Sequence, residues 1–330
     1  MAAARDSLVS LTMEQNQSML PLDLLDQLSR SEARIDNIPL ALFGLGQGSI
    51  DMLREDLVFD AIPGNKLRKL MHNIRYVLHN DAMPILTFGG AYSNHIAAVA
   101  AAGHHFGIKT IGLIRGEELG DAVSVNPTLS RAKKQGMELH FIDRVTYRLK
   151  DQDDFQSVLR ETYGPCYIIP EGGTNALAVQ GCKEMMQSIR QDFDVMTLAV
   201  GTGGTMAGVL KGLADHQRAM GFSVLKGYDH RPLIARYTAL DQCTLVGDHH
   251  FGGYAKITEE LIEFINTFKE RTQIALDPIY SGKMMFGLLK MLKNDKHLRS
   301  QRILALHSGG VQGIEGINIE LARKGLPQIN

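Results

Sequence analysis

The sequence contains few cysteines and no tryptophan. Its cysteines are odd in number, widely spaced and without a C-x-x-C pair: Cys166, Cys182 and Cys243. This arrangement predicts neither a disulfide framework nor a zinc site. The charges also nearly cancel, because 35 Lys and Arg residues stand against 36 Asp and Glu residues. Without a broad field of one sign, we expect neither a nucleic acid nor a membrane surface as a partner.

Long hydrophobic runs are absent as well. No stretch approaches the roughly 20 apolar residues of a membrane-spanning helix, and the first 20 residues lack the unbroken apolar core of a signal peptide. The chain has 330 residues, 44% of them apolar, which is enough for one large or two modest domains. We therefore expect a cytoplasmic enzyme.

Glycine, in contrast, is abundant, with 33 residues, many of which follow short apolar runs. From residue 84 onward these runs alternate with stretches of helical spacing, a pattern typical of βαβ units and parallel sheets. The pattern predicts an α/β fold made of two doubly wound domains with parallel sheets. We expect helices near 205–219, 258–271 and 283–296, and strands at 84–90, 109–115, 138–142, 166–170, 194–200, 223–229 and 302–307.

The clearest local signal is AVGTGGTMAGVLKGL, residues 199–213, where a strand runs into a glycine-rich turn and a helix follows at once. Free amides at a helix start, together with the helix dipole, favour an anion such as phosphate. The spacing is not that of a nucleotide P-loop. A dinucleotide G-x-G-x-x-G fits imperfectly, because its sixth position is Met206. A plain tight turn is the alternative for this segment.

Polar residues also follow other predicted strands. In FGGAYSNHIAAV (88–99), Ser93, Asn94 and His95 stand at a helix start after two glycines. Capping alone would explain only one of these three residues, whereas together they would form a good receptor for a carboxylate. DPIYSGK (277–283) and LALHSGG (304–310) place further polar residues where open α/β sheets bind ligands: Tyr280, Ser281 and Ser308.

The segment GNKLRKL (64–70) holds two lysines three residues apart, Lys66 and Lys69. Taken alone, Lys66 is as compatible with a solvated charge at a helix start as with a catalytic amine. A single phosphate cradle, no metal-ligand cluster and a lysine preceded by Gly64 and Asn65 together indicate one cofactor, pyridoxal 5′-phosphate. It needs an amine for a Schiff base and an anion site for its phosphate.

The chain resembles the family of 1-aminocyclopropane-1-carboxylate deaminases and D-cysteine desulfhydrases. These are pyridoxal-phosphate enzymes with the tryptophan-synthase-β-like fold, fold type II. The resemblance is carried by six motifs that span residues 64 to 310: GNKLRKL, GGAYSNH, EGGTN, GTGGT, DPIYSGK and HSGG, in this order. Each motif is modest alone, but six in the same order are specific.

The resemblance implies roles for the first motif. Lys66 would hold the cofactor as a Schiff base and Lys69 would help to bind its phosphate, while Arg68 is left as a surface or structural charge. The other cofactor-binding residues that the resemblance implies are Asn94, Gly201, Thr202, Gly203, Gly204, Thr205 and Ser308.

The resemblance also implies the residues around the substrate, a small amino acid. Asn94 would hydrogen-bond the phenolic oxygen of the cofactor, and Ser93 and His95 would hold the substrate carboxylate. Tyr280 would sit beside cofactor and substrate, and Tyr254 matches a second active-site tyrosine in a looser motif. Residues 69–171 would form the small domain and residues 1–68 with 172–330 the large one, with the active site between them. The family also implies a homodimer.

The two activities of the family require different chemistry. Opening a cyclopropane ring without a hydrogen on Cα needs a strong electron sink, which a carboxylate near the pyridine nitrogen would provide. Deaminases have glutamate and leucine where this chain has Ser281 and Ser308, so these serines and His95 favour desulfhydrase chemistry. Ser281 is expected to contact the substrate. In β-elimination, Lys66 removes the α-proton, sulfide leaves from Cβ, and the aminoacrylate hydrolyses to pyruvate and ammonia.

Other functions stay open at this point. Leu67 replaces the usual threonine of desulfhydrases, Tyr92 replaces a glutamine, and IAAVAAA lacks a nearby arginine, so the substrate pocket differs from that of the family. Ring opening of the cyclopropane acid or action on another small (D-)amino acid are alternatives. A nicotinamide-dependent oxidoreductase is the alternative of another class, since Asp229 ends the predicted strand 223–229, slightly later than a dinucleotide site requires.

Overall fold

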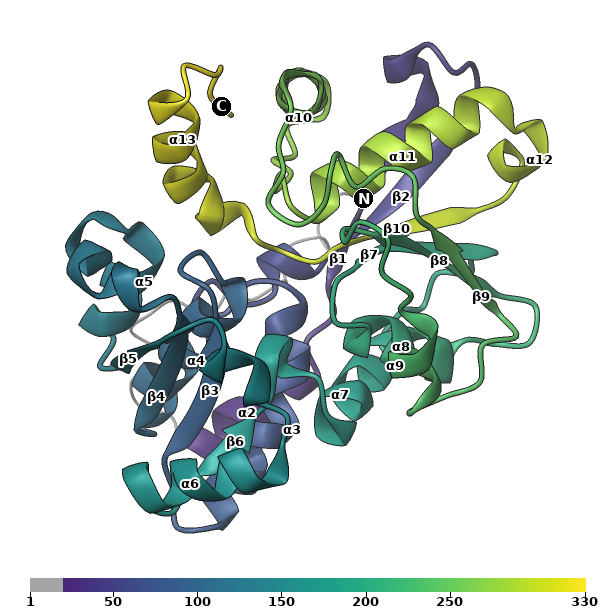
Figure 1. The fold of residues 1–330 in the computed structure, drawn as a ribbon. Coiled ribbons are helices and arrows are strands. Elements are labelled where there is room, and N and C mark those ends of the chain that lie inside the picture. Colours follow the sequence, from purple (N-terminus) through teal and green to yellow (C-terminus); the bar gives the residue numbers. More distant parts are fainter. Residues whose placement is uncertain (1–19) are drawn as a thin grey trace.

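The computed structural model describes residues 20–330 and contains two separate β-sheets, each packed between helices (Figure 1). This organisation confirms the predicted α/β fold class. The predicted absence of a signal peptide concerns residues 1–20, all of which except Leu20 lie outside the described residues. In the part of the chain that the structure describes, no helix is both long and apolar enough to span a membrane.

The strands divide unequally between the two sheets. Within residues 20–330 they are β1 (Arg34–Pro39), β2 (Ser49–Arg54), β3 (Ile85–Gly89), β4 (Thr110–Arg115), β5 (Glu138–Ile142), β6 (Tyr167–Ile169), β7 (Val195–Val200), β8 (Arg218–Ser223), β9 (Cys243–Val246) and β10 (Ile303–His307). The larger sheet has the order β1-β2-β10-β7-β8-β9 and the smaller one β5-β4-β3-β6. Only the edge pair β1–β2 is antiparallel among the pairs described, a common variation on parallel sheets.

Helices connect the strands and cover both faces of each sheet (Figure 1). They are α2 (Pro21–Ser29), α3 (Asn65–His79), α4 (Asn94–Phe106), α5 (Pro127–Lys134), α6 (Asp153–Tyr163), α7 (Ala176–Gln187), α8 (Gly204–Gly212), α9 (Arg231–Ala235), α10 (Glu259–Thr272), α11 (Ser281–Asn294), α12 (Lys296–Arg299) and α13 (Ile314–Arg323).

The core lies on both faces of each sheet because successive strand residues point in opposite directions. In β3, Ile85 joins the apolar cluster under α3 and α4, whereas Leu86 joins the cluster with Leu159 of α6. In β10, Ile303 packs on the side of α10 and α11, and Leu304 on the side of α7 and α8. This two-sided burial explains why these strands appear in the sequence as nearly continuous apolar runs.

Glycines let α3, α7 and α8 cross at close range. A Cβ on Gly181 of α7 would lie 2.0 Å from the carbonyl oxygen of Arg68 in α3. A Cβ on Gly208 of α8 would lie 2.3 Å from the Cβ of Cys182 in α7. The three helices are therefore in backbone contact, and α7 lies between the other two (Figure 1). Helix α3 runs unbroken through residues 68 and 69, where the predicted domain boundary falls, and that boundary stays a prediction.

The predicted strand at 223–229 is wrong. Strand β8 ends at Ser223, and the residues that follow form a loop. The segment RAMGFS of β8 contains an arginine and a glycine, so it lacks the apolar run that identified the other strands, yet it pairs with β7 along its whole length. The helix predicted at 205–219 is also too long, because α8 ends at Gly212. The sequence patterns did not predict β1, β2 and β9, which lie at or near the edges of the larger sheet.

Candidate active site

A pocket of about 580 Å³ lies between the carboxyl ends of strands from the two sheets. Residues that follow β3 and β6, with Arg115 at the end of β4, line one side, and residues that follow β7 and β10 line the other. Open α/β sheets bind their ligands at such strand ends. Of the predicted site residues, only Ser281 is absent from the lining, which contains Lys66, Lys69, Ser93, Asn94, His95, Gly201, Thr202, Gly203, Gly204, Thr205, Tyr254, Tyr280 and Ser308.

Lys66 stands in the first turn of α3, after a backbone turn that requires glycine. Gly64 has φ 79° and ψ −160°, a region that other residues avoid, and a Cβ there would lie 2.0 Å from the carbonyl oxygen of Ser308. The same oxygen accepts a hydrogen bond from the Asn65 amide at 3.2 Å. Burial lowers the pKa of the Lys66 amine to about 8. At physiological pH the Lys66 amine is therefore neutral in a larger fraction of molecules than the amine of an exposed lysine is.

The Lys69 amine lies one turn further along α3, among oxygen atoms. It donates to the carbonyl oxygen of Gly172, to Thr174 Oγ1 at 2.9 Å and to Thr202 Oγ1 at 3.5 Å. Burial and then the positive charge of Lys66 lower the pKa of Lys69 to about 7. An anion bound beside Lys69 would stabilise its charged form.

The glycine–threonine turn after β7 leads directly into α8. Gly203 is the N-cap of this helix, with a left-handed φ of 75°. A Cβ on Gly204 would lie 2.7 Å from Thr174 Oγ1, so the turn and the EGGTN segment are in close contact. Asn65 Nδ2 donates to Thr205 Oγ1 at 2.8 Å and thereby ties the turn to the start of α3. The amides and the dipole at the start of α8 lie on the same side as the Lys69 amine, which contacts Thr202 of this turn. Together these groups form an anion site.

Ser93 and Asn94 begin α4 on the opposite side of the pocket. The Ser93 hydroxyl accepts a hydrogen bond from the Ile96 amide at 3.3 Å and is the N-cap of the helix. Its hydroxyl hydrogen stays available as a donor. Asn94 Oδ1 accepts from Gln312 Nε2 at 3.5 Å, so the helix start contacts the segment after β10. The predicted capping role of Ser93 is therefore present together with its position in the pocket.

His95 is buried, and its hydrogen bonds define its tautomer. The Thr87 hydroxyl donates to the Ile169 carbonyl at 2.8 Å, so His95 Nε2 must donate its hydrogen to Thr87 Oγ1, also at 2.8 Å. Burial, followed by the charges of Lys66 and Lys69, lowers the pKa of His95 well below its ordinary value. The ring is therefore neutral at physiological pH. Its Nδ1 has no hydrogen-bond partner among the described residues and offers a lone pair rather than an N–H.

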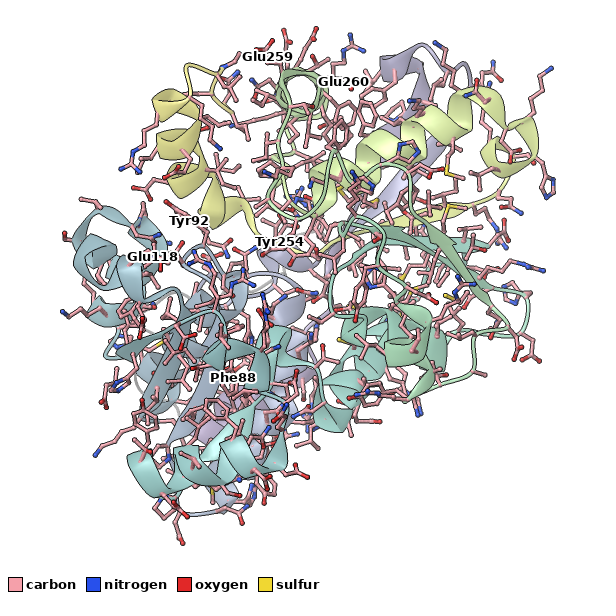
Figure 2. All side chains as sticks on the ribbon, viewed as in Figure 1. Phe88, Tyr92, Glu118, Tyr254, Glu259 and Glu260 are labelled. Carbon is pink, nitrogen blue, oxygen red and sulfur yellow. The ribbon has the colours of Figure 1, made fainter. Side chains whose placement is uncertain are left out.

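The two predicted tyrosines meet edge to face, with ring centroids 6.0 Å apart. Burial raises the pKa of both phenols, and the neighbouring Tyr254 raises that of Tyr280 further. Both are therefore protonated at physiological pH and can donate hydrogen bonds. Figure 2 labels Tyr254 and Tyr92, which both line the pocket, Tyr92 on the smaller-sheet side.

The loop that carries Tyr254 is held by a buried lysine. The Lys283 amine donates to the carbonyl oxygens of His250 at 3.0 Å and Gly253 at 2.8 Å. The residues on either side of Tyr254 have left-handed backbone, with φ 124° at Gly253 and 54° at Ala255. Lys283 thus satisfies carbonyl groups of a strained loop, which fixes the position of Tyr254.

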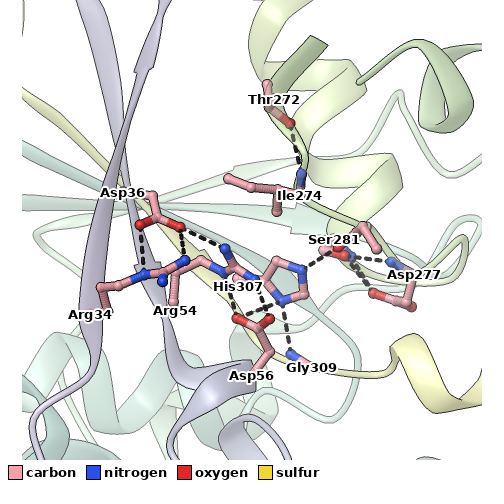
Figure 3. A network of polar contacts seen from close by, with 11 residues as sticks. Arg34, Asp36, Arg54, Asp56, Thr272, Ile274, Asp277, Ser281, His307 and Gly309 are labelled. Carbon is pink, nitrogen blue, oxygen red and sulfur yellow. Dashed lines mark hydrogen bonds and ion pairs between the residues drawn. The ribbon is translucent and has the colours of Figure 1, made fainter. Parts of the chain in front are cut away.

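Ser281 lies behind the pocket. Its hydroxyl donates to Asp277 Oδ1 at 2.7 Å and accepts from the Asp277 amide at 2.9 Å (Figure 3). Asp277 Oδ2 in turn accepts from the amides of Ile279 and Tyr280. In this structure Ser281 therefore closes the turn that presents Tyr280, and a direct contact of Ser281 with the substrate stays a prediction.

Ser308 follows β10 and lines the pocket directly. The preceding residue, His307, makes two hydrogen bonds to the backbone. Its Nε2 donates to the carbonyl of Ala275 at 2.7 Å, and its Nδ1 accepts from the Gly309 amide at 3.3 Å (Figure 3). These contacts hold the backbone next to Ser308. Ser308 thereby lies at the end of β10, one of the two central strands of the larger sheet.

Several residues of the site were not predicted individually. Thr174 and Gly172 contact Lys69, and the motif EGGTN was their signal. Glu171, the first residue of the same motif, also lines the pocket, and Arg115 lines it without any motif that marked it. Arg68, predicted as a surface or structural charge, is structural. It is buried and pairs with Glu55 at 2.8 Å.

The groups in the pocket fit pyridoxal 5′-phosphate. Lys66 supplies an amine of lowered pKa for the aldehyde, and Lys69 with the start of α8 supplies an anion site on the same side. The turn itself requires glycine, since Gly203 has a left-handed φ and a Cβ on Gly204 would lie 2.7 Å from Thr174 Oγ1. Fold and site together define a pyridoxal-phosphate-dependent enzyme of fold type II.

Comparisons with known proteins narrow this class. Residues 54–309 match the family model described as "Pyridoxal-phosphate dependent enzyme". A putative 1-aminocyclopropane-1-carboxylate deaminase of Pyrococcus furiosus is 30% identical over 289 residues, which cover 79% of this chain and 84% of the relative. The D-cysteine desulfhydrase of Klebsiella pneumoniae is 27% identical over 79% of this chain and 86% of its own length.

One further relative and one solved structure indicate the same family. The mitochondrial bifunctional D-cysteine desulfhydrase/1-aminocyclopropane-1-carboxylate deaminase of Arabidopsis thaliana is 28% identical over 79% of this chain and 72% of its own length. The crystal structure of an ACC deaminase homologue superposes with a TM-score of 0.74 and 26% identity, over 92% of this chain and 97% of that one. The chain therefore belongs to the pyridoxal-phosphate-dependent family of 1-aminocyclopropane-1-carboxylate deaminases and D-cysteine desulfhydrases.

The nicotinamide alternative is wrong. The matching family uses pyridoxal phosphate, and Asp229 does not end a strand. It lies in the loop after β8 and pairs with Arg231 at 2.9 Å on the surface. The acidic residue that a dinucleotide ribose requires at the end of the second strand is therefore missing.

Proposed function

We propose that the protein is a D-cysteine desulfhydrase-like lyase, which eliminates sulfide from D-cysteine and yields pyruvate and ammonia. One observation carries this proposal: Ser308 lines the pocket at the end of β10, where no described carboxylate lines it. Among the described residues that line the pocket, the only carboxylate is Glu171, which follows β6 on the smaller-sheet side. A hydroxyl cannot hold a proton on the pyridine nitrogen, and this weaker electron sink suits β-elimination better than ring opening.

In this proposal four groups of the pocket would hold the cofactor. Lys66 would bind it covalently, Lys69 with the amides and threonines of residues 201–205 would bind its phosphate, and Ser308 would hydrogen-bond its ring nitrogen. Asn94 would hydrogen-bond its phenolic oxygen. When bound, the cofactor supplies the electron sink that acidifies the Cα–H bond of the substrate.

Side chains of the protein bind the substrate, remove its proton and assist the departure of the sulfur. Ser93 and the free amides of α4 bind the substrate carboxylate. His95, for which the same role was predicted, presents a lone pair at Nδ1, which accepts a hydrogen bond and does not donate one to a carboxylate. The Lys66 amine takes the proton from Cα, and the Cβ–S electron pair leaves with the sulfur. Because the phenols of Tyr254 and Tyr280 stay protonated, they can donate a hydrogen bond to the leaving sulfur but cannot serve as the base.

A substrate panel on the holoenzyme tests this function. We expect sulfide and pyruvate in equal amounts from D-cysteine, with kcat/KM at least about tenfold above the values for L-cysteine and D-serine. The cyclopropane acid should give no 2-oxobutanoate. If 2-oxobutanoate forms at a comparable rate, the enzyme is a ring-opening deaminase, and if D-cysteine gives no sulfide, the proposed reaction is wrong.

The role of Lys66 is tested by Lys66→Ala in parallel. We expect this variant to lose the visible absorbance of the bound cofactor and at least about a thousandfold in kcat, because the amine is both the attachment point and the base. Lys293→Ala is the matched control, since Lys293 is an exposed lysine of α11, and it should keep both properties. Full activity in Lys66→Ala would contradict the assignment.

A further inference from the structure

A second cavity, of about 430 Å³, adjoins the pocket on the smaller-sheet side. The two share four lining residues: Gly90, Ala91, Arg115 and Glu171. A Cβ on Gly90 would lie 3.6 Å from Nη2 of Arg115, so this guanidinium stands beside the turn that leads to Ser93. A ligand bound at the start of α4 can therefore extend past Arg115 into the second cavity.

The second cavity is built on the carboxyl ends of β4 and β5. Arg115 is the last residue of β4, and Glu171 follows β6. The short segment after β5 adds the other charged residues of the lining, which are Arg144, Arg148 and Lys150, together with Tyr147. The same strand-end geometry that forms the main pocket thus continues across the smaller sheet.

Positive charge dominates this cavity. Among the side chains that the structure describes, four cationic groups line it, and Glu171 is the one acidic lining residue. Arg144 pairs with Glu118, labelled in Figure 2, and Lys150 lies 3.2 Å from Asp151 and 3.5 Å from Glu171. Arg115 and Arg148 have no carboxylate within 4 Å among the side chains that the structure describes. Two guanidinium groups are therefore available to an incoming anion.

Tyr147 holds the cationic groups in place and adds a donor. Its ring is buried, with Arg115 5.5 Å and Lys150 5.4 Å from the ring centroid. The hydroxyl approaches Glu171, yet no hydrogen bond of normal geometry satisfies it in the described structure. An unsatisfied buried hydroxyl is costly, and an anionic ligand in the cavity would accept its hydrogen.

We propose that this cavity is a subsite for a second anionic group of the substrate, so that the preferred substrate is a β-substituted amino acid whose side chain ends in a carboxylate, sulfonate or phosphate. This inference rests on the proposed β-elimination for its chemistry. The Cα–H bond breaks and its proton passes to Lys66, while the electron pair forms the Cα=Cβ bond. The bond from Cβ to sulfur or oxygen breaks, and its electrons leave with the anionic substituent. Water then converts the enamine to pyruvate and ammonia, without any oxidant or reductant.

Binding to the holoenzyme tests the subsite without catalysis. Glutamate and glutamine have the same shape but differ in the charge of the side chain, and each is titrated as both enantiomers by calorimetry. For the enantiomer that binds, we expect glutamate to bind at least about tenfold more tightly than glutamine. Arg148→Gln, a change at an exposed side chain, should reduce this preference to below about threefold. Arg190→Gln should leave it unchanged, since Arg190 is 84% exposed and pairs with Glu32 elsewhere on the surface.

Elimination provides the second readout. S-Carboxymethyl-D-cysteine and S-(2-hydroxyethyl)-D-cysteine are nearly isosteric and both release pyruvate. We expect the carboxymethyl compound to have at least about tenfold higher kcat/KM, and Arg148→Gln to remove this difference mainly through KM. Arg115→Gln should act in the same direction, and thermal unfolding of each variant checks that the fold is kept.

Each outcome decides the question. Equal binding of glutamate and glutamine, or a preference that survives both arginine substitutions, would overturn the subsite. If the binding preference depends on Arg148 but no cysteine derivative yields pyruvate, the subsite stands and the proposed β-elimination falls. If D-cysteine is cleaved but the carboxymethyl compound is not preferred over the hydroxyethyl compound, the proposed function stands and the subsite is contradicted.

Discussion

Lys66 and Lys69 are three residues apart on α3, and both amines reach the same pocket. The surroundings of the two amines differ. Lys66 donates to the side chain of Asn65, whereas Lys69 is surrounded by the oxygens of the EGGTN and GTGGT segments. Both amines have a lowered pKa, so the oxygen atoms around Lys69, and not the pKa, distinguish the anion-binding lysine from Lys66.

The lowered pKa of Lys66 predicts how cofactor uptake depends on pH. Cofactor-free protein should bind added pyridoxal phosphate covalently at a rate that rises with pH up to about 8 and then levels off, because burial lowers the pKa of this amine to about 8. Only the neutral amine attacks an aldehyde, so a lower pKa moves the plateau to lower pH. Stopped-flow absorbance would measure the rate. Nα-acetyl-lysine is the control, and its rate should keep rising toward pH about 10.4. Coinciding profiles would show that Lys66 is not desolvated.

At the scale of elements, the position of α3 depends on a buried ion pair. Arg68 donates to both carboxylate oxygens of Glu55, at 2.8 and 2.9 Å, and to the carbonyl oxygens of Leu28 and Ser31. These bonds join the first turns of α3 to the segments that end α2 and follow β2. The backbone that carries Lys66 is therefore fixed by charged groups on the side of the helix that faces away from the pocket.

Removing one partner of this ion pair should be strongly destabilising. We expect Glu55→Gln to lower the free energy of unfolding by about 3 kcal/mol or more, because it leaves the Arg68 charge buried without its counter-charge. Urea unfolding measures the change. Glu32→Gln breaks the exposed pair with Arg190 and should cost less than about 1 kcal/mol. Similar effects of the two substitutions would mean that Arg68 finds another partner.

At the scale of the whole molecule, α13 joins the two sides of the pocket. This helix follows β10 of the larger sheet, yet Glu320 on it accepts a hydrogen bond at 3.1 Å from the hydroxyl of Tyr92, which precedes α4. Glu315 of the same helix lies 3.8 Å from Arg131 of α5. The turn that carries Ser93 and Asn94 is thereby joined to the helix that follows the opposite sheet, and Tyr92, which departs from the usual family motif, makes this contact.

Removing the hydrogen bond between Tyr92 and Glu320 should raise KM more than it lowers kcat. We expect Tyr92→Phe to raise KM by about three- to tenfold with kcat within about twofold, since one hydrogen bond of about 1 kcal/mol is lost from a group that the mechanism does not use. Steady-state kinetics with the best substrate of the panel measures both constants. Tyr76→Phe alters a phenol that is 45% exposed on α3 and should change neither. A fall in kcat at constant KM would instead place Tyr92 at the reacting atoms.

Sequence patterns predicted those helices and strands whose local apolar pattern agrees with their place in the fold. The strands of the smaller sheet and the helices α4, α10 and α11 lie where their apolar periodicity placed them, within a few residues. The strand predicted over Val224 and Leu225 failed because β8 is selected by pairing with β7 rather than by its own β propensity. The boundaries of the domains and the expected homodimer stay predictions.

The sequence by itself determined the cofactor and the family, because their signals are short motifs whose chemistry is local: a lysine after Gly-Asn, a glycine-rich helix start and polar residues after strands. Only the tertiary structure decided which side chains meet. It buried Arg68 against Glu55, brought Thr174 to Lys69 and placed Arg115 beside Tyr147. The physical reason is that the partners of a charge or hydroxyl come from segments distant in the chain, and no local pattern encodes their encounter.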